Sequence, residues 1–204
     1  MPLPLDGVTA FILGTGPSLP ANRLASLYRY FTIGVNHLWK QAHTFRPTVG
    51  FWIDGGVYDE NPEWFDSTQC VCDQSALPRR DLDGRGFIAL RGVGGPLPKR
   101  PSPKSLYLRP NTGVVAAIWA VSLGCEPVVL LGMDGEDDGR RPDQLSAMRN
   151  AVGELLAAYP AVWRWPRCVR DDAAVWSECI QSNRLNPCNN ARGTLRDYYQ
   201  EELR

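Results

Sequence analysis

The sequence predicts an α/β fold in which helices cover both faces of a doubly wound, mostly parallel sheet. Two stretches carry this prediction, residues 8–35 and residues 105–132. Each reads as a strand, a glycine-containing turn, a helix and a second strand, and such a unit places its two strands parallel in one sheet. We expect residues 1–160 to form this domain and residues 161–204 to form a C-terminal extension or lid packed on the same domain.

The first unit begins with the largely apolar residues 8–13, which end at the turn Gly14-Thr15-Gly16-Pro17-Ser18. An apolar run of this length is typical of a strand buried on both faces. Ser18 is a suitable N-cap for a helix after the turn. Helical spacing then places four side chains on one face, namely Leu24, Leu27, Tyr28 and Phe31. Residues 32–35 predict the second strand, which ends at Asn36.

The remaining elements follow from the same criteria. We expect strands at 48–53, 87–90, 105–108, 127–132 and 162–165, and helices at 114–123, 145–159 and 194–203. Gly124 is placed to end the helix of residues 114–123, and Thr194 to cap the helix of residues 194–203. Residues 58–64 predict a loop or a short helix, and residues 175–177 a short strand or the start of a helix.

The composition indicates a globular domain that is not directed to a highly charged partner. Of 204 residues, 44% are hydrophobic, and the 22 Lys and Arg residues balance the 22 Asp and Glu residues. No apolar run is long enough to cross a bilayer, and the first residues lack the pattern of a signal peptide. We therefore expect a cytoplasmic protein. The six cysteines show no zinc-type spacing, so we interpret them as packing residues and free thiols.

A local excess of positive charge lies between residues 79 and 109. Against Asp81 and Asp83 stand eight basic residues: Arg79, Arg80, Arg85, Arg91, Lys99, Arg100, Lys104 and Arg109. Part of this segment, residues 92–104, is rich in glycine and proline and therefore predicts a loop. The loop is either a mobile basic flap over phosphates or a solvated surface excursion. The same charge leaves room for a nucleic-acid acceptor.

Several polar residues follow the predicted strands, at the edge where open α/β sheets bind ligands. They include the Gly14–Ser18 turn, Asn36 and Asp134. A dinucleotide site is disfavoured, because Leu19 replaces the third glycine of the Gly-x-Gly-x-x-Gly pattern and Asn36 replaces the usual acidic residue. The turn therefore indicates one side of a mononucleotide site.

These motifs, in this order, resemble those of the bacterial sialyltransferases of glycosyltransferase family 42 and of the related MptE-like (DUF115) proteins. The similarity spans about residues 8 to 135. It rests on Gly14-Thr15-Gly16-Pro17-Ser18-Leu19 after the first strand and Asn36 after the second. It also rests on Asn111-Thr112-Gly113 at a helix start and on Leu131-Gly132-Met133-Asp134 at a strand end. The resemblance implies a Rossmann-like domain that binds a nucleotide or a nucleotide-sugar.

The resemblance also implies roles for individual residues. The phosphate and ribose would be lined by Gly14, Thr15, Gly16 and Ser18. Asn36 and Asp54 would face the nucleoside. Asn111, Thr112 and Gly113 would offer a second helix N-terminus to the phosphate. Asp134 would lie near the reacting bond or a metal ion.

The chemistry stays open at this point. The sialyltransferases use a histidine in their C-terminal part as general base, whereas the histidines here are His37 and His43. The base of a transferase would then be His37, Asp54 or Asp134, unless the acceptor is acidic enough to need none. Asp134, with Glu136, Asp137 and Asp138, either helps to hold Mg²⁺ on a diphosphate or belongs to a solvated loop.

Three functions remain in view. The first is a transferase with a nucleotide-activated donor of the CMP, UDP or ATP type, most simply a nucleotide-sugar-dependent glycosyltransferase with a small-molecule or glycan acceptor. The second is a Mg²⁺-dependent diphosphokinase of the MptE-like kind. The third is a nucleotide-binding protein without catalytic activity.

Overall fold

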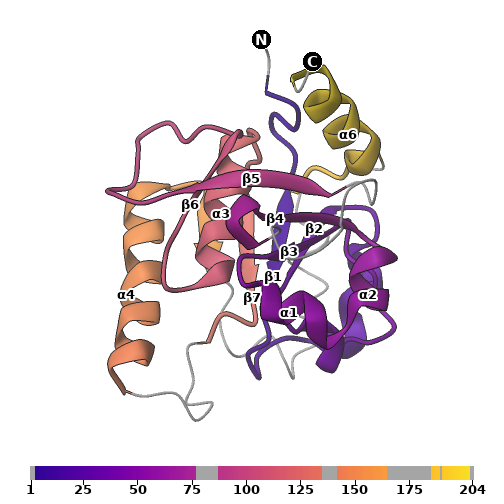
Figure 1. The fold of residues 1–204 in the computed structure, drawn as a ribbon, viewed down its shortest axis with the longest axis horizontal. Coiled ribbons are helices and arrows are strands. Elements are labelled where there is room, and N and C mark those ends of the chain that lie inside the picture. Colours follow the sequence, from indigo (N-terminus) through magenta and orange to yellow (C-terminus); the bar gives the residue numbers. More distant parts are fainter. Residues whose placement is uncertain (1–2, 77–86, 135–141, 165–184, 189, 203–204) are drawn as a thin grey trace.

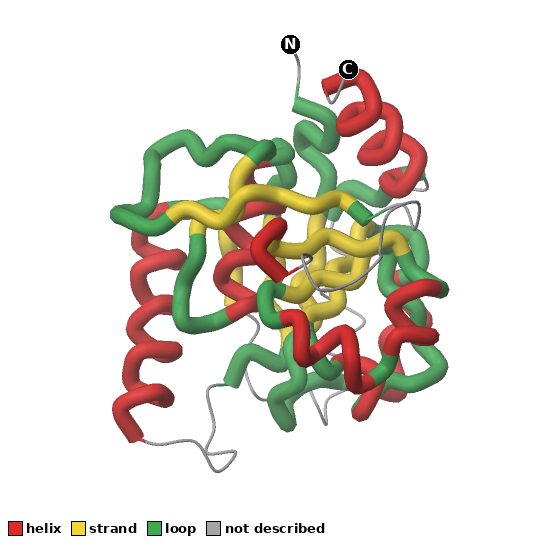
Figure 2. Tube along the Cα trace, in the orientation of Figure 1, coloured by secondary structure: helices red, strands yellow, loops and turns green. Residues whose placement is uncertain are grey.

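Within the described part of the chain, eight parallel strands form one sheet (Figure 1). The structure is a computed structural model and describes residues 3–76, 87–134, 142–164, 185–188 and 190–202. Helices lie on both faces of the sheet, as Figure 2 shows. The protein therefore has the α/β, Rossmann-like architecture that the two strand–turn–helix–strand units predict.

The strands lie in the order β6-β5-β4-β3-β2-β1-β7-β8. Their bounds, in chain order, are β1 (Ala10–Leu13), β2 (Phe31–Val35), β3 (Val49–Trp52), β4 (Gln69–Asp73), β5 (Ile88–Val93), β6 (Ser105–Tyr107), β7 (Val128–Leu131) and β8 (Val162–Arg164). From β1 to β6 each strand is added to the same side, and β7 then returns to the other side of β1. The topological switch point, where such sheets bind ligands, therefore lies between β1 and β7.

Side chains of the central strands alternate between two cores, as the pleat of a strand requires. Ala10 and Ile12 of β1 face one core, whereas Phe11 and Leu13 face the other. All four side chains have no exposed surface. Each strand of this kind contributes to both sides of the sheet, which explains why its sequence shows no polar face.

The two cores are covered by different helices. One core contains α3 (Thr112–Ser122), α4 (Pro142–Ala158) and α6 (Ala191–Glu202). The other contains η1 (Ala21–Leu27), η2 (Leu38–Lys40), α1 (Gly55–Glu60) and α2 (Pro62–Asp66). A further short turn, η3 (Gln74–Ala76), follows β4. In the described part of the chain no helix has both the length and the apolarity that a membrane span requires.

The segment after the glycine turn differs from the predicted amphipathic helix. It is the 3₁₀-helix η1, which begins after Pro20 and has no side-chain cap. Leu24 and Leu27 are buried as expected, but Tyr28 is 59% exposed. Phe31 belongs to β2 rather than to the helix. The 3₁₀-helix is short and ends before β2, so it does not present a continuous α-helical face. The residue at i+7, Phe31, therefore lies in the next strand.

The strand β4 was not expected from the sequence, because Gln69-Cys70-Val71-Cys72-Asp73 contains one β-branched residue. Cys70, Val71 and Cys72 are fully buried. Burial raises the pKa of both thiols, in Cys72 to about 12. The cysteines therefore stay protonated and pack as small hydrophobic side chains.

The C-terminal helix begins earlier than its predicted cap. Because α6 starts at Ala191, Thr194 lies inside the helix, where its hydroxyl donates to the carbonyl of Asn190. Strand β8 confirms the expected short edge strand and pairs with β7. The predicted element at 175–177 lies outside the described residues, and the division of the chain at residue 160 remains a prediction.

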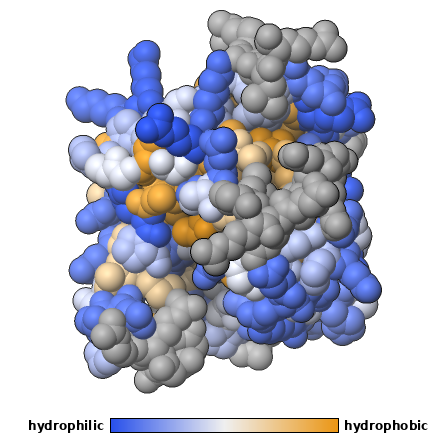
Figure 3. Space-filling model, viewed as in Figure 1, coloured by the Kyte–Doolittle hydropathy of each residue, from blue (hydrophilic) through white to orange (hydrophobic). Residues whose placement is uncertain are grey.

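The glycine- and proline-rich segment is a loop, and two tyrosines hold it against the helices. The hydroxyl of Tyr159, just beyond α4, donates to the carbonyl of Pro98 at 2.6 Å, and the hydroxyl of Tyr199 in α6 donates to that of Pro103 at 2.6 Å. Figure 1 shows the loop beside the C-terminal end of α4. On the face seen in Figure 3, hydrophobic side chains gather around β5 and β6, while most of the remaining surface is hydrophilic.

Tyr199 connects three parts of the structure. It accepts a hydrogen bond from Nε1 of the buried Trp119 in α3 at 2.9 Å and donates to Pro103. Burial raises its pKa, so the hydroxyl keeps the proton that it donates.

We predict that Tyr199→Phe lowers the free energy of unfolding by about 1–3 kcal/mol, because a buried N–H and a carbonyl lose their partner. Tyr28→Phe is the matched control, since Tyr28 is exposed and stacks on Phe45 through its ring. Urea denaturation measures both variants. Equal stability of the two would show that the hydroxyl of Tyr199 does not stabilise the fold.

Candidate functional site

The carboxyl ends of β1, β2, β3 and β7 carry most of the residues that the sequence singled out. They bring together the turn of residues 14–18 (the glycine turn), Asn36, Asp54 and the turn of residues 132–134 (the β7 turn). The N-terminus of α3 reaches the same edge, because Thr112 contacts Asn36. The candidate site is thus built around the switch point of the sheet.

The glycine turn and the β7 turn are bonded directly to each other. The N–H of Gly16 donates to the carbonyl of Gly132 at 2.8 Å. The N–H of Ser18 donates to Oδ2 of Asp134 at 2.7 Å. Two of the backbone donors predicted for a phosphate therefore bind the neighbouring turn in this structure.

The glycines in these turns allow the close contact. A Cβ on Gly16 would lie 2.7 Å from the carbonyl oxygen of Gly132 and would collide with Oδ2 of Asp134. A Cβ on Gly14 would lie 2.8 Å from the sulfur of Met133. Gly132 itself has φ +64, a conformation that glycine adopts without strain. These small residues are therefore required by packing between the two turns, whatever ligand binds there.

Asp134 is the acidic residue at the centre of this arrangement. It is 8% exposed and accepts the hydrogen bond from Ser18. Among the residues that the structure describes, no three His, Cys, Asp or Glu side chains are grouped as a metal site would need. A Mg²⁺ ion held by one carboxylate and by phosphate oxygens needs no such group, so Asp134 remains a candidate ligand. Glu136, Asp137 and Asp138 lie outside the described residues.

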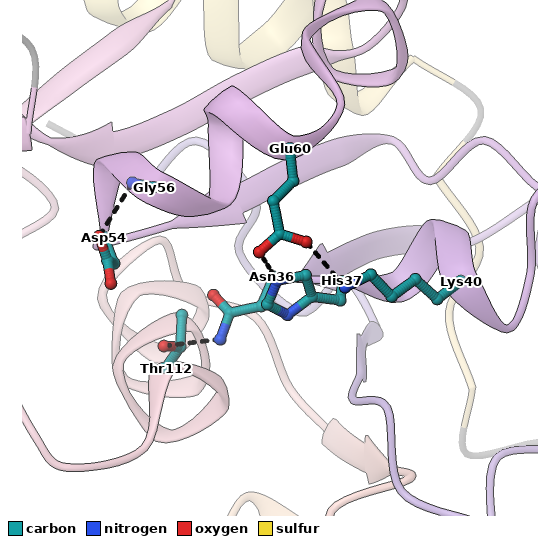
Figure 4. A network of polar contacts seen from close by, with 7 residues as sticks. All are labelled: Asn36, His37, Lys40, Asp54, Gly56, Glu60 and Thr112. Carbon is teal, nitrogen blue, oxygen red and sulfur yellow. Dashed lines mark hydrogen bonds and ion pairs between the residues drawn. The ribbon is translucent and has the colours of Figure 1, made fainter.

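Asn36 has the most unusual environment of the predicted residues. Its φ is +47, in the left-handed region. Its side-chain nitrogen donates to the hydroxyl of Thr112 at 3.2 Å (Figure 4). Its Oδ1 is buried and has no hydrogen-bond partner within the described part of the chain. Asn36 and Thr112, which the sequence singled out separately, are thus in contact, although they lie on different elements.

The start of α3 is held by its own cap. Oδ1 of Asn111 accepts from the N–H of Gly113 at 2.9 Å and from that of Val114 at 3.4 Å. A Cβ on Gly113 would collide with the side chain of Met133. Asn111 and Gly113 therefore shape the helix start and its contact with the β7 turn, while Thr112 faces Asn36.

The two remaining candidates for a general base differ in environment. Asp54 is exposed and caps α1, because its Oδ1 accepts from the N–H of Gly56 at 2.9 Å. His37 follows Asn36 directly, and its Nε2 lies 3.0 Å from Oε1 of Glu60 (Figure 4). Asp54 thus has a structural task as a helix cap, whereas His37 is held by a carboxylate.

The middle of the glycine- and proline-rich loop lies at the C-terminal end of α4. Because Pro98 binds Tyr159 at the end of α4, Lys99 and Arg100 lie at the opposite end from the start of that helix. A helix of 17 residues is about 25 Å long. The two interpretations of the loop, a flap over phosphates and a solvated surface excursion, both stay predictions. Arg79, Arg80 and Arg85 lie outside the described residues.

Three side chains near the edge were not expected from the sequence. Glu60 ends α1 and binds His37 and Lys40. Gln41 donates from Nε2 to the carbonyl of Thr15 in the glycine turn. Asp73, at the end of β4, is 4% exposed and accepts from the N–H of Ser75. A prediction of β4 would have identified Asp73, but no local pattern marks the other two.

Comparisons of the chain with protein-family models, with curated proteins and with solved structures find no match.

We predict that Gly16→Ala lowers the free energy of unfolding by about 1–3 kcal/mol, because its methyl group cannot fit between the two turns. Gly153→Ala is the opposite control. Gly153 lies in α4 with nothing within 4 Å of an added Cβ, so alanine there should stabilise the protein by about 1 kcal/mol. Denaturant unfolding measures both. An unchanged stability of Gly16→Ala would contradict the close contact of the turns.

Proposed function

We propose that this protein is a transferase with a nucleotide-activated donor, and specifically a nucleotide-sugar-dependent glycosyltransferase. The proposal rests above all on Asn36. Its backbone is in the left-handed region, and its buried Oδ1 accepts no hydrogen bond within the described part of the chain. An unsatisfied buried acceptor costs about 1–3 kcal/mol, and such costs are concentrated at functional sites.

The position of Asn36 favours a nucleoside as the ligand. The residue follows β2, beside the switch point, where doubly wound sheets bind the ribose or base of a nucleotide. Oδ1 can accept a hydrogen bond from a sugar hydroxyl or from an amino group of a base. The hydroxyl of Thr112 accepts a hydrogen bond from the nitrogen of the same carboxamide, so Oδ1 is already oriented before a ligand binds.

The start of α3 supports a phosphate next to the nucleoside. Thr112 is the first residue of this helix of 11 residues, whose N-terminal end carries partial positive charge. The side-chain cap by Asn111 uses the N–H groups of Gly113 and Val114, so the phosphate would meet mainly the hydroxyl and the N–H of Thr112. The donor phosphates would then extend from Thr112 toward Asp134.

A second candidate function is a Mg²⁺-dependent diphosphokinase. The observation that favours it is the buried carboxylate of Asp134 beside the glycine turn, because a carboxylate is the ligand that Mg²⁺ needs next to a diphosphate. Here Mg²⁺ would neutralise charge on the transferred diphosphate, and Asp134 is the described residue that would hold it.

We predict that wild-type protein is stabilised in thermal-shift measurements by at least one member of a panel of CMP, UDP, their sugar conjugates and ATP. Asn36→Gly should weaken that nucleotide by tenfold or more, about 1.4 kcal/mol, because the carboxamide is lost. The same variant should not unfold more easily, since glycine accepts φ +47 without strain. Thr112→Val should weaken binding in the same way.

Asn150→Ala, at an exposed position of α4, is the control for a general effect of removing a carboxamide. A wild-type protein that binds no nucleotide of the panel would contradict the proposal. Binding of ATP that requires Mg²⁺, and that loses this requirement in Asp134→Asn, would favour the diphosphokinase over the glycosyltransferase.

A further inference from the structure

A pair of side chains next to the proposed nucleoside site has the geometry of a base and its support. Nε2 of His37 lies 3.0 Å from Oε1 of Glu60, and Nζ of Lys40 lies 2.7 Å from Oε2 of the same carboxylate. In Figure 4 the imidazole lies beside Asn36, whose carboxamide reaches Thr112, while Glu60 approaches the ring from α1. His37 and Glu60 belong to two segments that follow the neighbouring strands β2 and β3.

The backbone determines where both residues lie. Asn36, with φ +47, turns the chain at the end of β2, so that His37 lies at the same edge as the N-cap residue of the short helix η2. Asp54 caps α1 at the end of β3, and Glu60 is the last residue of that helix. Because β2 and β3 are adjacent and parallel, the ends of η2 and α1 are brought together above the sheet edge.

The charges around the ring determine which of its nitrogens carries the proton. The pKa of Glu60 is lowered first by its hydrogen bond with Lys40 and then by that with His37, so the carboxylate is ionised at neutral pH. An ionised carboxylate only accepts hydrogen bonds, so Nε2 of a neutral His37 must donate. Nδ1 then carries the lone pair. Glu60 from α1 binds the imidazole, Lys40 from η2 binds the same carboxylate, and Trp39 packs on the imidazole with ring centroids 5.1 Å apart.

We propose that His37 is the general base of the transfer reaction and that Glu60 is its positioning residue. This inference rests on the proposed glycosyltransferase function. The side chain of His37 is 33% exposed, so a hydroxyl group of an acceptor can reach the ring. Nδ1 takes the proton of that hydroxyl as its oxygen forms a bond to the anomeric carbon of the donor sugar. The bond from that carbon to the phosphate oxygen breaks, and its electron pair leaves with the nucleotide.

The first test needs no ligand. Long-range ¹H–¹⁵N correlation NMR at neutral pH distinguishes the two imidazole tautomers, and the chain has only two histidines, so His43→Gln assigns the signals. We expect His37 in the Nε2–H form in the wild type and a mixture in Glu60→Ala. Glu63→Ala, which removes an exposed carboxylate at the start of α2, should leave the tautomer unchanged. An Nδ1–H tautomer in the wild type would overturn the inference.

The second test uses the nucleotide-sugar that binds best in the panel, with water as the acceptor, and measures release of free nucleotide. His37→Gln should lower kcat by about 10²–10⁴-fold, with KM changed less than about twofold, and should remove the acidic limb of the pH profile of kcat. Glu60→Ala should lower kcat by about tenfold and displace that limb, whereas Glu63→Ala should change neither.

The outcomes separate this inference from the function on which it rests. Turnover in His37→Gln at the wild-type rate would overturn the role of the pair while leaving the glycosyltransferase. Binding of a donor that is never cleaved would also overturn it and would leave only the nucleotide site. A wild-type protein that binds no donor would overturn both proposals.

Discussion

The candidate site depends on the direct contact between the glycine turn after β1 and the β7 turn. β1 and β7 are neighbours that pair in parallel from Ala10 and Val128 onward, and their turns continue the pairing beyond the sheet. The bonds from Gly16 to Gly132 and from Ser18 to Asp134 hold the turns together. The two turns therefore leave no room for a ligand between them. A ligand of the proposed site would lie over the turns or beside them, toward Asn36.

This constraint gives the two halves of the proposed site different characters. On the side of β7, backbone donors and a carboxylate already satisfy one another, and the geometry is fixed by packing. On the side of β2, Asn36 keeps a strained backbone and a buried acceptor without a partner in the described residues. Groups that the fold leaves unsatisfied are the ones that a ligand can satisfy, which is why the proposals concentrate on Asn36, Thr112 and His37.

The sequence predicted the features of the fold that depend on local patterns. Apolar runs that end in glycine, asparagine or aspartate identified β1, β2, β3 and β7, and the apolar residues 114–123 with the stop at Gly124 identified α3. Strand β4 was not predicted, because buried cysteines take the place of β-branched residues in it. The 3₁₀ form of η1 escaped because helical spacing alone does not distinguish it from an α-helix over two turns.

For the site, the sequence predicted which residues share an edge, because the ends of parallel strands meet there. The sequence did not predict which polar atoms already form hydrogen bonds within the protein. That Ser18 binds Asp134, and that Glu60 binds His37, depends on how turns and short helices pack, and these contacts join residues that are far apart in the chain. The position of the basic loop could not be predicted from the sequence either, because hydrogen bonds from Tyr159 and Tyr199 determine where it lies.

Helix α3 has a consequence for the order in which the chain can fold. Nearly all of its side chains are buried, so it has no polar face with which to rest on a partly formed sheet. Part of its cover comes from Leu195 and Tyr199 of α6, which follows it late in the sequence. During synthesis one side of an apolar helix therefore remains uncovered until α6 has emerged, and in that interval this side is open to aggregation.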